Sequence, residues 1–465
     1  MNNKNIWLNS KQKDIKKIDA FAKDYIDFIS RGKTERECVD LAVNLLEENG
    51  YEELNRLIKE GRTLKAGDKV YATQMNKSVV AFTIGQKPME EGLNILGAHI
   101  DSPRMDVKQN PLYEADGIAY LDTHYYGGIK KYQWVTLPLA IHGVVVKKDG
   151  TTVEINIGED PDDPVFFISD LLIHLAADQM EKKASKVIEG DALDIIVGNM
   201  PLKKEEDKEV KEAVKANILR FLKDEYGFEE ADFESAELEV VPAGRAREAG
   251  FDRSMILGYG HDDRVCAYPS LMAEISVKDP VRTTCCILVD KEEIGSVGAT
   301  GMRSNFFVNM VAEVMNLTGE YSELKVRRCL AASYMLSSDV NAGFDPSYAD
   351  KFDKKNASAL GNGMVFNKFT GSRGKSGSND SNAEYIAMIR KIMDEEGVIY
   401  QTAELGKVDV GGGGTIAYIL ALYGMNVIDC GVAVLNMHAP WEAVSKADIF
   451  GTFMGYKVFL NKVGL

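Results

Sequence analysis

Near-continuous apolar runs, separated by helical stretches, constrain the fold of this 465-residue chain more than any other feature. Examples are TTCCILVD at 283–290, AASYMLSSD at 331–339 and MNVIDCGVAVLNMH at 425–438. Apolar runs without polar alternation are typical of strands that are covered on both faces. Helical patterns at 380–397 and 415–424 lie among them. The sequence therefore predicts an α/β fold, with a mixed central sheet and helices on both faces.

A different pattern interrupts these strands between about residues 105 and 250. The stretch 131–158 alternates like β-hairpins, with KKDGT as a turn. Residues 201–228 predict a charged helix whose apolar residues form one stripe: Val210, Val214, Ile218 and Phe221. Because 465 residues are too many for one ordinary domain, we predict two. The first is made of 1–105 and 250–465, and a β-rich domain of 106–249 is inserted into it.

Charge and cysteine content exclude several kinds of partner and compartment. The formal net charge of −16 argues against nucleic acid or an anionic membrane as the main partner, because both need clustered cations. The sequence contains no apolar stretch long enough to span a bilayer and no secretory leader pattern. The six cysteines contain no CxxC pair and do not form a disulfide framework. We therefore expect a cytoplasmic protein.

Residues that can bind metal ions follow four of the predicted strands. In open α/β sheets, ligands bind beyond the carboxyl ends of the strands. The strands at 94–98, 283–290, 333–338 and 426–437 are followed by His99 and Asp101, by Glu292 and Glu293, by Asp339 and by His438. The sequence GHDDR adds Asp262 at the start of a helical run. One such residue alone is usually a cap or a structural residue, but four strands that end in this way predict one shared site. Histidine and carboxylate ligands suit Zn²⁺ or a similar divalent ion.

Two neighbouring glutamates, Glu292 and Glu293, allow two interpretations. A polar turn is one interpretation. The other is that one carboxylate binds a metal ion while its neighbour accepts a proton from water, which is the pairing that metal-assisted hydrolysis requires. Asp101 lies two residues after His99, where its carboxylate could orient the imidazole.

Five motifs in order resemble the aspartyl aminopeptidase family of co-catalytic two-metal peptidases. They are GAHIDSPRMDVK, HDDR, VDKEEIGS, SSDVNAGFDPSY and NMHAPWE, and they cover roughly 90–110 and 255–445. The resemblance implies a zinc peptidase catalytic domain with an inserted dimerisation domain. It also implies release of N-terminal amino acids from peptides, two divalent ions in each subunit, and self-assembly into a tetrahedral dodecamer. Zn²⁺ is the expected ion, with Co²⁺ and Mn²⁺ as alternatives.

The same resemblance implies a role for each matching residue. His99 and Asp339 would bind the first ion, and Asp262 would bridge both ions. Glu293 and His438 would complete the second site. Glu292 would be the general base and later the acid, and Asp101 would support His99.

His174, in the HLAAD stretch of the inserted domain, also matches a family position. The resemblance implies that it stabilises the oxyanion or contacts substrate in a neighbouring subunit, with a metal ligand as a second interpretation. Its apolar neighbours in DLLIHLAAD make a histidine of the hydrophobic core the third.

Two further stretches are candidates for contacts with the substrate. In acidic-specific members of the family, a basic residue contacts the acidic side chain of the substrate. The corresponding region here is 364–380, with Lys368, Arg373 and Lys375 as counterparts, and a solvent-exposed basic loop is the alternative. Four glycines, Gly411 to Gly414, precede a helix and would let Gly412 approach the substrate closely, or simply form a tight turn.

Three other functions stay open at this point. The glutamate pair and the final histidine also occur in related two-metal peptidases and in deacylases with another substrate class. A non-catalytic assembly protein on the same fold would be expected to lack a ligand, and this sequence retains every ligand position of the family.

Overall fold

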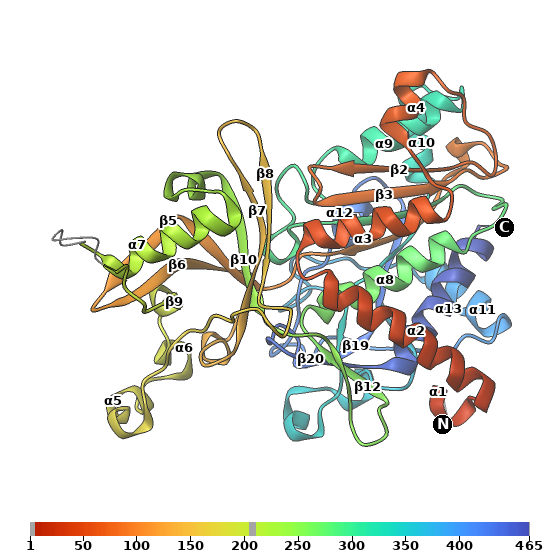
Figure 1. Cartoon of the computed structure of the whole chain (residues 1–465). Coiled ribbons are helices and arrows are strands. Elements are labelled where there is room, and N and C mark those ends of the chain that lie inside the picture. Colours follow the sequence, from red (N-terminus) through yellow and green to blue (C-terminus); the bar gives the residue numbers. More distant parts are fainter. Residues whose placement is uncertain (1–4, 204–210, 465) are drawn as a thin grey trace. The chain divides into compact units, whose positions relative to one another are not determined.

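The computed structural model describes residues 5–203 and 211–464, which form two compact units (Figure 1). Unit 1 contains the chain up to Asp101, Ala246–Met437 and the chain from Glu442 onward. Unit 2 contains Ser102–Arg245 and His438–Trp441. Within the described residues, no helix is both long and apolar enough to cross a membrane.

The main sheet of unit 1 is mixed. In the described part of the chain its nine strands follow the order β1-β2-β3-β13-β4-β14-β18-β16-β17. Their bounds are Glu52–Glu53, Lys69–Gln74, Ser78–Thr83, Thr284–Val289, Asn94–His99, Tyr334–Ser337, Asn426–Gly431, Met364–Asn367 and Tyr400–Thr402. The four central strands β13, β4, β14 and β18 are parallel, whereas β3 and β16 pair antiparallel with β13 and β18. The carboxyl ends of the four parallel strands therefore meet at one edge of the sheet.

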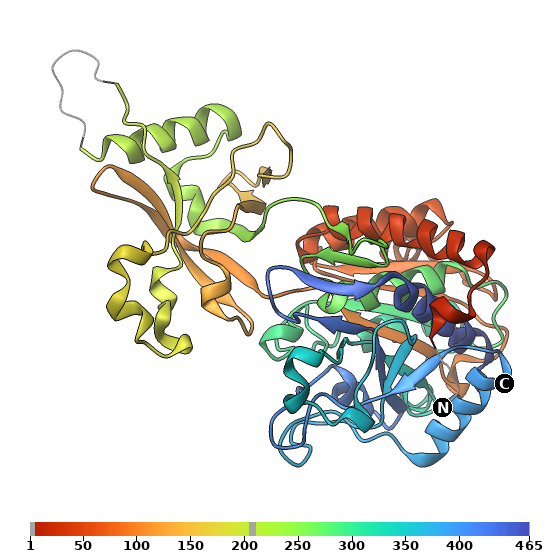
Figure 2. The same ribbon diagram turned by 90° about the horizontal axis from the view of Figure 1, so that it is seen from below.

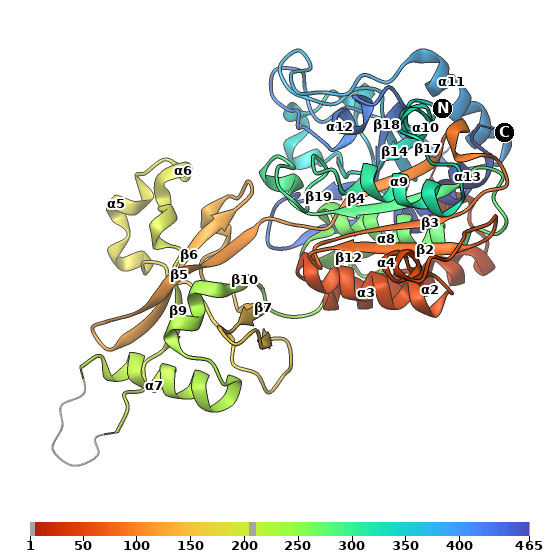
Figure 3. The same ribbon diagram turned by 90° about the horizontal axis from the view of Figure 1, so that it is seen from above.

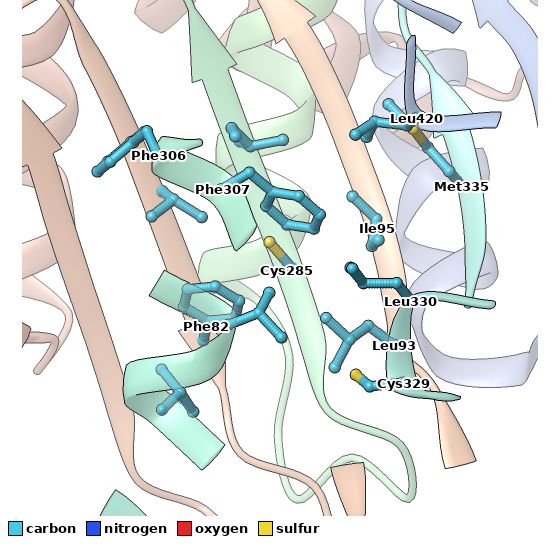
Figure 4. Packing of buried hydrophobic residues seen from close by; sticks show 14 of the residues in the cluster. Phe82, Leu93, Ile95, Cys285, Phe306, Phe307, Cys329, Leu330, Met335 and Leu420 are labelled. Carbon is cyan, nitrogen blue, oxygen red and sulfur yellow. The ribbon is translucent and has the colours of Figure 1, made fainter. Parts of the chain in front are cut away.

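Helices cover both faces of this sheet because its central strands are apolar on both sides. In β13, Cys285 and Ile287 belong to one hydrophobic cluster, while Cys286 and Leu288 belong to another. The first cluster packs under α4, α9, α10 and α12, which span Leu54–Glu60, Phe306–Leu317, Glu323–Ala331 and Ala417–Ala421 (Figure 4). The opposite face packs against α2, α3, α8, α11 and α13, which span Gln12–Arg31, Glu35–Glu48, His261–Ile275, Ala383–Glu395 and Lys446–Lys462 (Figure 3). The predicted α/β fold is confirmed.

A smaller sheet of unit 1 corrects one predicted strand. Its order is β11-β12-β20-β19-β15, with bounds Arg247–Ala249, Met255–Gly258, Glu442–Ser445, Ala433–Leu435 and Asn341–Ala342. The single strand predicted at 426–437 is wrong, because β18 ends at Gly431 and the chain continues as β19 in this second sheet. A Cβ atom on Gly431 would lie 1.8 Å from the carbonyl oxygen of Asp339, so the two backbones are in direct contact there.

Unit 2 is built on an antiparallel sheet with the order β8-β7-β10-β5-β6-β9 (Figure 2). These strands span Thr152–Ile157, Leu139–Val146, Ala236–Pro242, Arg104–Ala115, Ile118–Tyr126 and Ile195–Gly198. The short helices α5 and α6 span Ala177–Met180 and Ala184–Val187. The helix predicted within 201–228 is shorter than expected: α7 covers Ala213–Phe221 and a π-helical turn follows at Leu222–Tyr226. Val214 is buried and Phe221 is exposed, while the predicted position Val210 lies outside the described residues.

Candidate metal centre

His99 ends β4 at the carboxyl edge of the main sheet, and its side chain is 1 % exposed. Its Nδ1 atom lies 3.0 Å from the backbone oxygen of Asp101 and 3.2 Å from Asp101 Oδ1. Its Nε2 atom lies 3.2 Å from Asp262 Oδ1. Burial lowers the pKa of His99, but hydrogen bonds to Asp101 and Asp262 outweigh it and raise the pKa well above its usual value. With Nδ1 held by Asp101, Nε2 is the nitrogen left to bind a cation.

Asp101 joins His99 to the glutamate pair. Its Oδ1 accepts a hydrogen bond from the backbone N–H of Glu292, and its Oδ2 accepts one from the backbone N–H of Glu293, both at 3.1 Å. The carboxylate of Asp101 is fully buried. Asp101 therefore positions the turn that carries both glutamates as well as the imidazole, and only the second of these tasks was predicted.

Glu292 and Glu293 lie in a 3₁₀ turn, Glu292–Ile294, just beyond β13. The turn is possible because Lys291 before it and Gly295 after it both adopt left-handed backbone angles, with φ of 70° and 98°. Glu292 Oε2 lies 3.9 Å from His99 Nε2, and the Glu292 side chain is 18 % exposed. Glu292 is thus beside the histidine and within reach of water.

Asp262 and Asp339 complete a cluster around His99. One ligand atom from each of His99, Asp262 and Asp339 lies within 4.8 Å of the other two. Asp262 and Asp263 open α8 with non-helical backbone angles, so both carboxylates precede its regular turns. Asp339 follows β14, the strand that pairs with β4.

The electrostatics of this cluster fit a divalent cation. Burial, followed by the charges of Asp263 and Glu292, raises the pKa of Asp339 well above its usual range. Burial also raises the pKa of Asp263, despite the opposing effect of His99. Buried carboxylates crowded in this way are unfavourable without a compensating positive charge. One imidazole and several carboxylates are ligands that Zn²⁺ accepts.

Further buried residues hold the cluster in place, a role that their positions in the sequence did not indicate. Glu442 Oε2 accepts a hydrogen bond from the Asp262 N–H at 3.0 Å. Arg264 is fully buried, and its Nε donates to the backbone oxygen of Ile100 at 3.0 Å. His261 Nδ1 lies 2.7 Å from the Tyr25 hydroxyl, and burial lowers the pKa of His261 to about 3. The HDDR and NMHAPWE motifs contain His261, Arg264 and Glu442, but only the tertiary structure shows what each side chain contacts.

His438 belongs to unit 2, whereas the residues described above belong to unit 1. It belongs to the short segment His438–Trp441 of unit 2, where its Nδ1 lies 2.9 Å from the backbone oxygen of Gly128. It follows β19 by three residues and does not directly end a strand of the main sheet. Its role as a metal ligand stays a prediction.

His174 is exposed and lies in a 3₁₀ turn, Ile173–Leu175, of unit 2. Its neighbours Leu172, Ile173 and Leu175 are 54 %, 69 % and 69 % exposed. The interpretation of His174 as a histidine of the hydrophobic core is therefore wrong, because the apolar residues around it do not form a core. Its predicted action in a neighbouring subunit stays a prediction.

The structure brings the two candidate substrate loops together. Gly371 N–H donates to the carbonyl oxygen of Gly413 at 2.8 Å. Lys375 Nζ lies 2.9 Å from Asp380 Oδ2 and 4.6 Å from the centre of the Phe369 ring. Lys368 and Arg373 are exposed, as is Lys375. The basic loop is therefore open to solvent, and the glycine run packs against it.

A mixed α/β sheet whose carboxyl edge carries a buried His–Asp–Asp cluster beside a glutamate pair is the arrangement of a metal-dependent hydrolase. A family model described as "Aminopeptidase I zinc metalloprotease (M18)" matches residues 28–460. The chain therefore belongs to this family of zinc metallo-aminopeptidases, which are hydrolases. The family resemblance that the motifs indicated is confirmed.

Relatives in sequence and structure agree with this assignment. The "Probable M18 family aminopeptidase 1" of Clostridium acetobutylicum is 60 % identical over 458 residues, which cover 98 % of each chain. The crystal structure of an M18 aminopeptidase from Thermotoga maritima, 45 % identical, superposes with a TM-score of 0.94 over 100 % of both chains. That of aminopeptidase I from C. acetobutylicum, 57 % identical, gives 0.92 over 98 % of this chain and 99 % of the other. A yeast aminopeptidase dodecamer, 21 % identical, shares the fold with a TM-score of 0.76 over 95 % and 96 % of the two chains.

Proposed function

We propose that this aminopeptidase hydrolyses the first peptide bond of its substrates with Glu292 as the general base. The observation that supports this most directly is the position of Glu292 Oε2, 3.9 Å from His99 Nε2, on a turn whose amides Asp101 holds. Glu292 takes a proton from the attacking water and later delivers it to the leaving amine. The N-terminal amino acid is the product.

Two divalent ions, most simply Zn²⁺, belong to this proposal. The buried donor set of His99, Asp262 and Asp339 supports the first ion, and the family resemblance implies that Asp262 would serve both ions. The family resemblance supports Glu293 and His438 as ligands of the second. When bound, such ions acidify water and polarise the scissile carbonyl. The chain's own residues then have separate tasks: Glu292 moves the proton, and Asp101 keeps both His99 and the turn of Glu292 in place.

We further propose a preference for acidic N-terminal residues. Arg373 and Lys368 are the better candidates for contacting an acidic side chain. Both are exposed, whereas Lys375 already pairs with Asp380. In a protein of net charge −16, an exposed group of cations would attract a negatively charged substrate.

Self-assembly into a tetrahedral dodecamer through the inserted domain 106–249 is also part of the proposal. Unit 2 exposes a series of apolar side chains, which is typical of a protein interface. These are Val165, Phe167, Leu171, Leu172, Ile173, Leu175 and Met180. His174 lies within this series and would contact a neighbouring subunit's substrate. The dodecamer reported for the yeast relative supports an assembly of twelve subunits.

A cytoplasmic location completes the proposal, with peptides and further copies of this chain, rather than nucleic acid or membrane, as partners. All six cysteines are buried free thiols, which is the state that a reducing compartment maintains.

One experiment separates this function from the alternatives. Peptides that differ in the N-terminal residue, each with a free or an acetylated amino group, are incubated with metal-stripped enzyme reloaded with Zn²⁺, Co²⁺ or Mn²⁺. We expect metal-dependent release of the first residue from free peptides, with Asp and Glu released fastest. Preferred cleavage of acetylated peptides would indicate a deacylase, and no cleavage with any ion would indicate a non-catalytic relative.

A further inference from the structure

We propose that Asp429 is a positioning residue that sets substrate specificity, by holding two loops of unit 1 at the edge of the sheet where Asp339 lies. The glycine loop is Gly411–Thr415 and the basic loop is Lys368–Asp380. The inference rests on the proposed function, because it assigns these loops to the substrate of the aminopeptidase.

The two loops form one structural element. Gly371 in the basic loop donates a hydrogen bond to the Gly413 carbonyl at 2.8 Å. Gly412 has a φ of +121°, and a Cβ atom there would lie 2.4 Å from the carbonyl oxygen of Gly371 and 2.7 Å from Ser372 Cα. Backbone contact this close leaves no room for a side chain. A displacement of one loop therefore displaces the other.

Both loops are attached to the same strand, β18. Thr415, at the end of the glycine loop, donates its hydroxyl to Asp429 Oδ1 at 2.6 Å, and the same hydroxyl accepts the N–H of Ala417 at 3.2 Å. Asn379, near the end of the basic loop, donates its side-chain amide to the carbonyl oxygen of Val427 at 3.0 Å. Asp429 is the member of these attachments that carries a carboxyl group.

Strand β18 also connects this anchor to the proposed metal site. Asp429 is opposite Ser337 in the parallel pair of β14 and β18, and Ser337 is two residues before Asp339. Two residues after Asp429, the backbone of Gly431 touches the backbone of Asp339. Asp429 therefore has a fixed position relative to Asp339, a proposed metal ligand, and so do the two loops attached to β18.

Burial of the Asp429 carboxyl carries a free-energy cost. Its side chain is 1 % exposed, and burial raises the pKa of Asp429 to about 7, while Thr415 and Asn379 act in the opposite direction. A buried carboxyl is unfavourable unless hydrogen bonds satisfy it. Asp429 Oδ1 accepts the hydroxyl of Thr415, so the carboxyl and the glycine loop stabilise one another, and the basic loop follows through its backbone contacts with the glycine loop.

The test replaces Thr415 with valine, which has nearly the same shape and lacks the donor. Thr415→Val removes the hydrogen bond to Asp429 and also the acceptor of the Ala417 N–H. It is expected to raise KM for the preferred peptides by about five-fold or more, the loss expected for at least one hydrogen bond, and to reduce the differences between N-terminal residues. The turnover number and bound metal should change less than about two-fold on the same reasoning. Asp429→Asn retains a carbonyl oxygen for the Thr415 hydroxyl and should preserve the wild-type ranking of peptides.

Thr318→Val is the matched control, because the Thr318 hydroxyl likewise donates a hydrogen bond, in this case to the backbone oxygen of Met315 at the end of α9. It should leave KM and the ranking unchanged. An unchanged KM and ranking in Thr415→Val, or a fall in turnover at constant KM, would overturn the inference.

Hydrogen exchange separates failure of this inference from failure of the proposed function. Thr415→Val should increase amide exchange in the glycine loop and the basic loop together, whether or not any peptide is cleaved. Faster exchange in the glycine loop alone would refute the coupling. If the wild-type enzyme cleaves no peptide, the specificity role is overturned along with the proposed function, even where the coupled exchange is observed.

Discussion

Replacing Asp101 with asparagine tests whether one buried carboxylate positions both His99 and the glutamate turn. The change preserves shape and removes one of two acceptor oxygens. In the native protein those oxygens accept the N–H groups of Glu292 and Glu293, both at 3.1 Å. An asparagine directs its NH₂ group toward one of these N–H groups, so at least one hydrogen bond is lost.

The magnitude follows from these contacts. A hydrogen bond to a charged group contributes about 1.5–3 kcal/mol, so Asp101→Asn should lower the free energy of unfolding of the metal-free protein by about 2 kcal/mol. The backbone oxygen of Asp101 still contacts His99 Nδ1 at 3.0 Å, so the imidazole keeps one partner. Loss of a residue that orients a metal ligand typically weakens metal affinity by about 10- to 100-fold. We expect Zn²⁺ affinity to fall within that range.

The assays are chemical unfolding of the metal-free protein and competition for Zn²⁺ with a chelator of known affinity. Asp68→Asn is the control, because Asp68 Oδ2 also accepts a backbone N–H, that of Lys65, at 2.9 Å in an exposed turn. The control should change neither quantity appreciably. If Asp101→Asn binds Zn²⁺ as tightly as the wild type, the carboxylate does not position the site and the reasoning is refuted.

Three other outcomes follow from the structure. Glu292→Gln should retain bound metal, measured by elemental analysis, and reduce kcat by about 10²- to 10⁴-fold; near-normal turnover would exclude Glu292 as the base. Dialysis against a chelator should abolish peptide cleavage and make the region around His99 unfold more easily. Added Zn²⁺ should reverse both effects, and cleavage that survives metal loss would contradict the proposed metal site. Burial raises the pKa of Glu274 to about 7, so the folded state holds a proton there that the unfolded state releases near pH 4.5. The contribution of Glu274 to the free energy of unfolding should therefore fall by about 3 kcal/mol as pH rises from about 4.5 to about 7. Glu274→Gln should remove this pH dependence, which is measured by urea titrations at pH 5 and pH 8.

Some errors of sequence interpretation have a common physical cause. Apolar neighbours made His174 resemble a histidine of the hydrophobic core, yet those neighbours are exposed on unit 2. The run at 425–438 resembled one strand, yet contact between Gly431 and Asp339 coincides with its transfer to a second sheet. A local pattern reports how apolar a segment is, but not what covers it or which sheet receives it.

The sequence by itself determined the α/β class and the edge at which its polar residues gather. Apolar side chains on both faces of β13 require helices on both sides, and parallel strands must present their carboxyl ends together. Only the tertiary structure decided which groups those residues contact. The hydrogen bonds from Glu292 and Glu293 to Asp101 join segments 191 and 192 residues apart, and the one from Thr415 to Asp429 joins a loop to a strand 14 residues further on. Short-range periodicity carries no information about such partners, because they are brought together by packing of the whole unit.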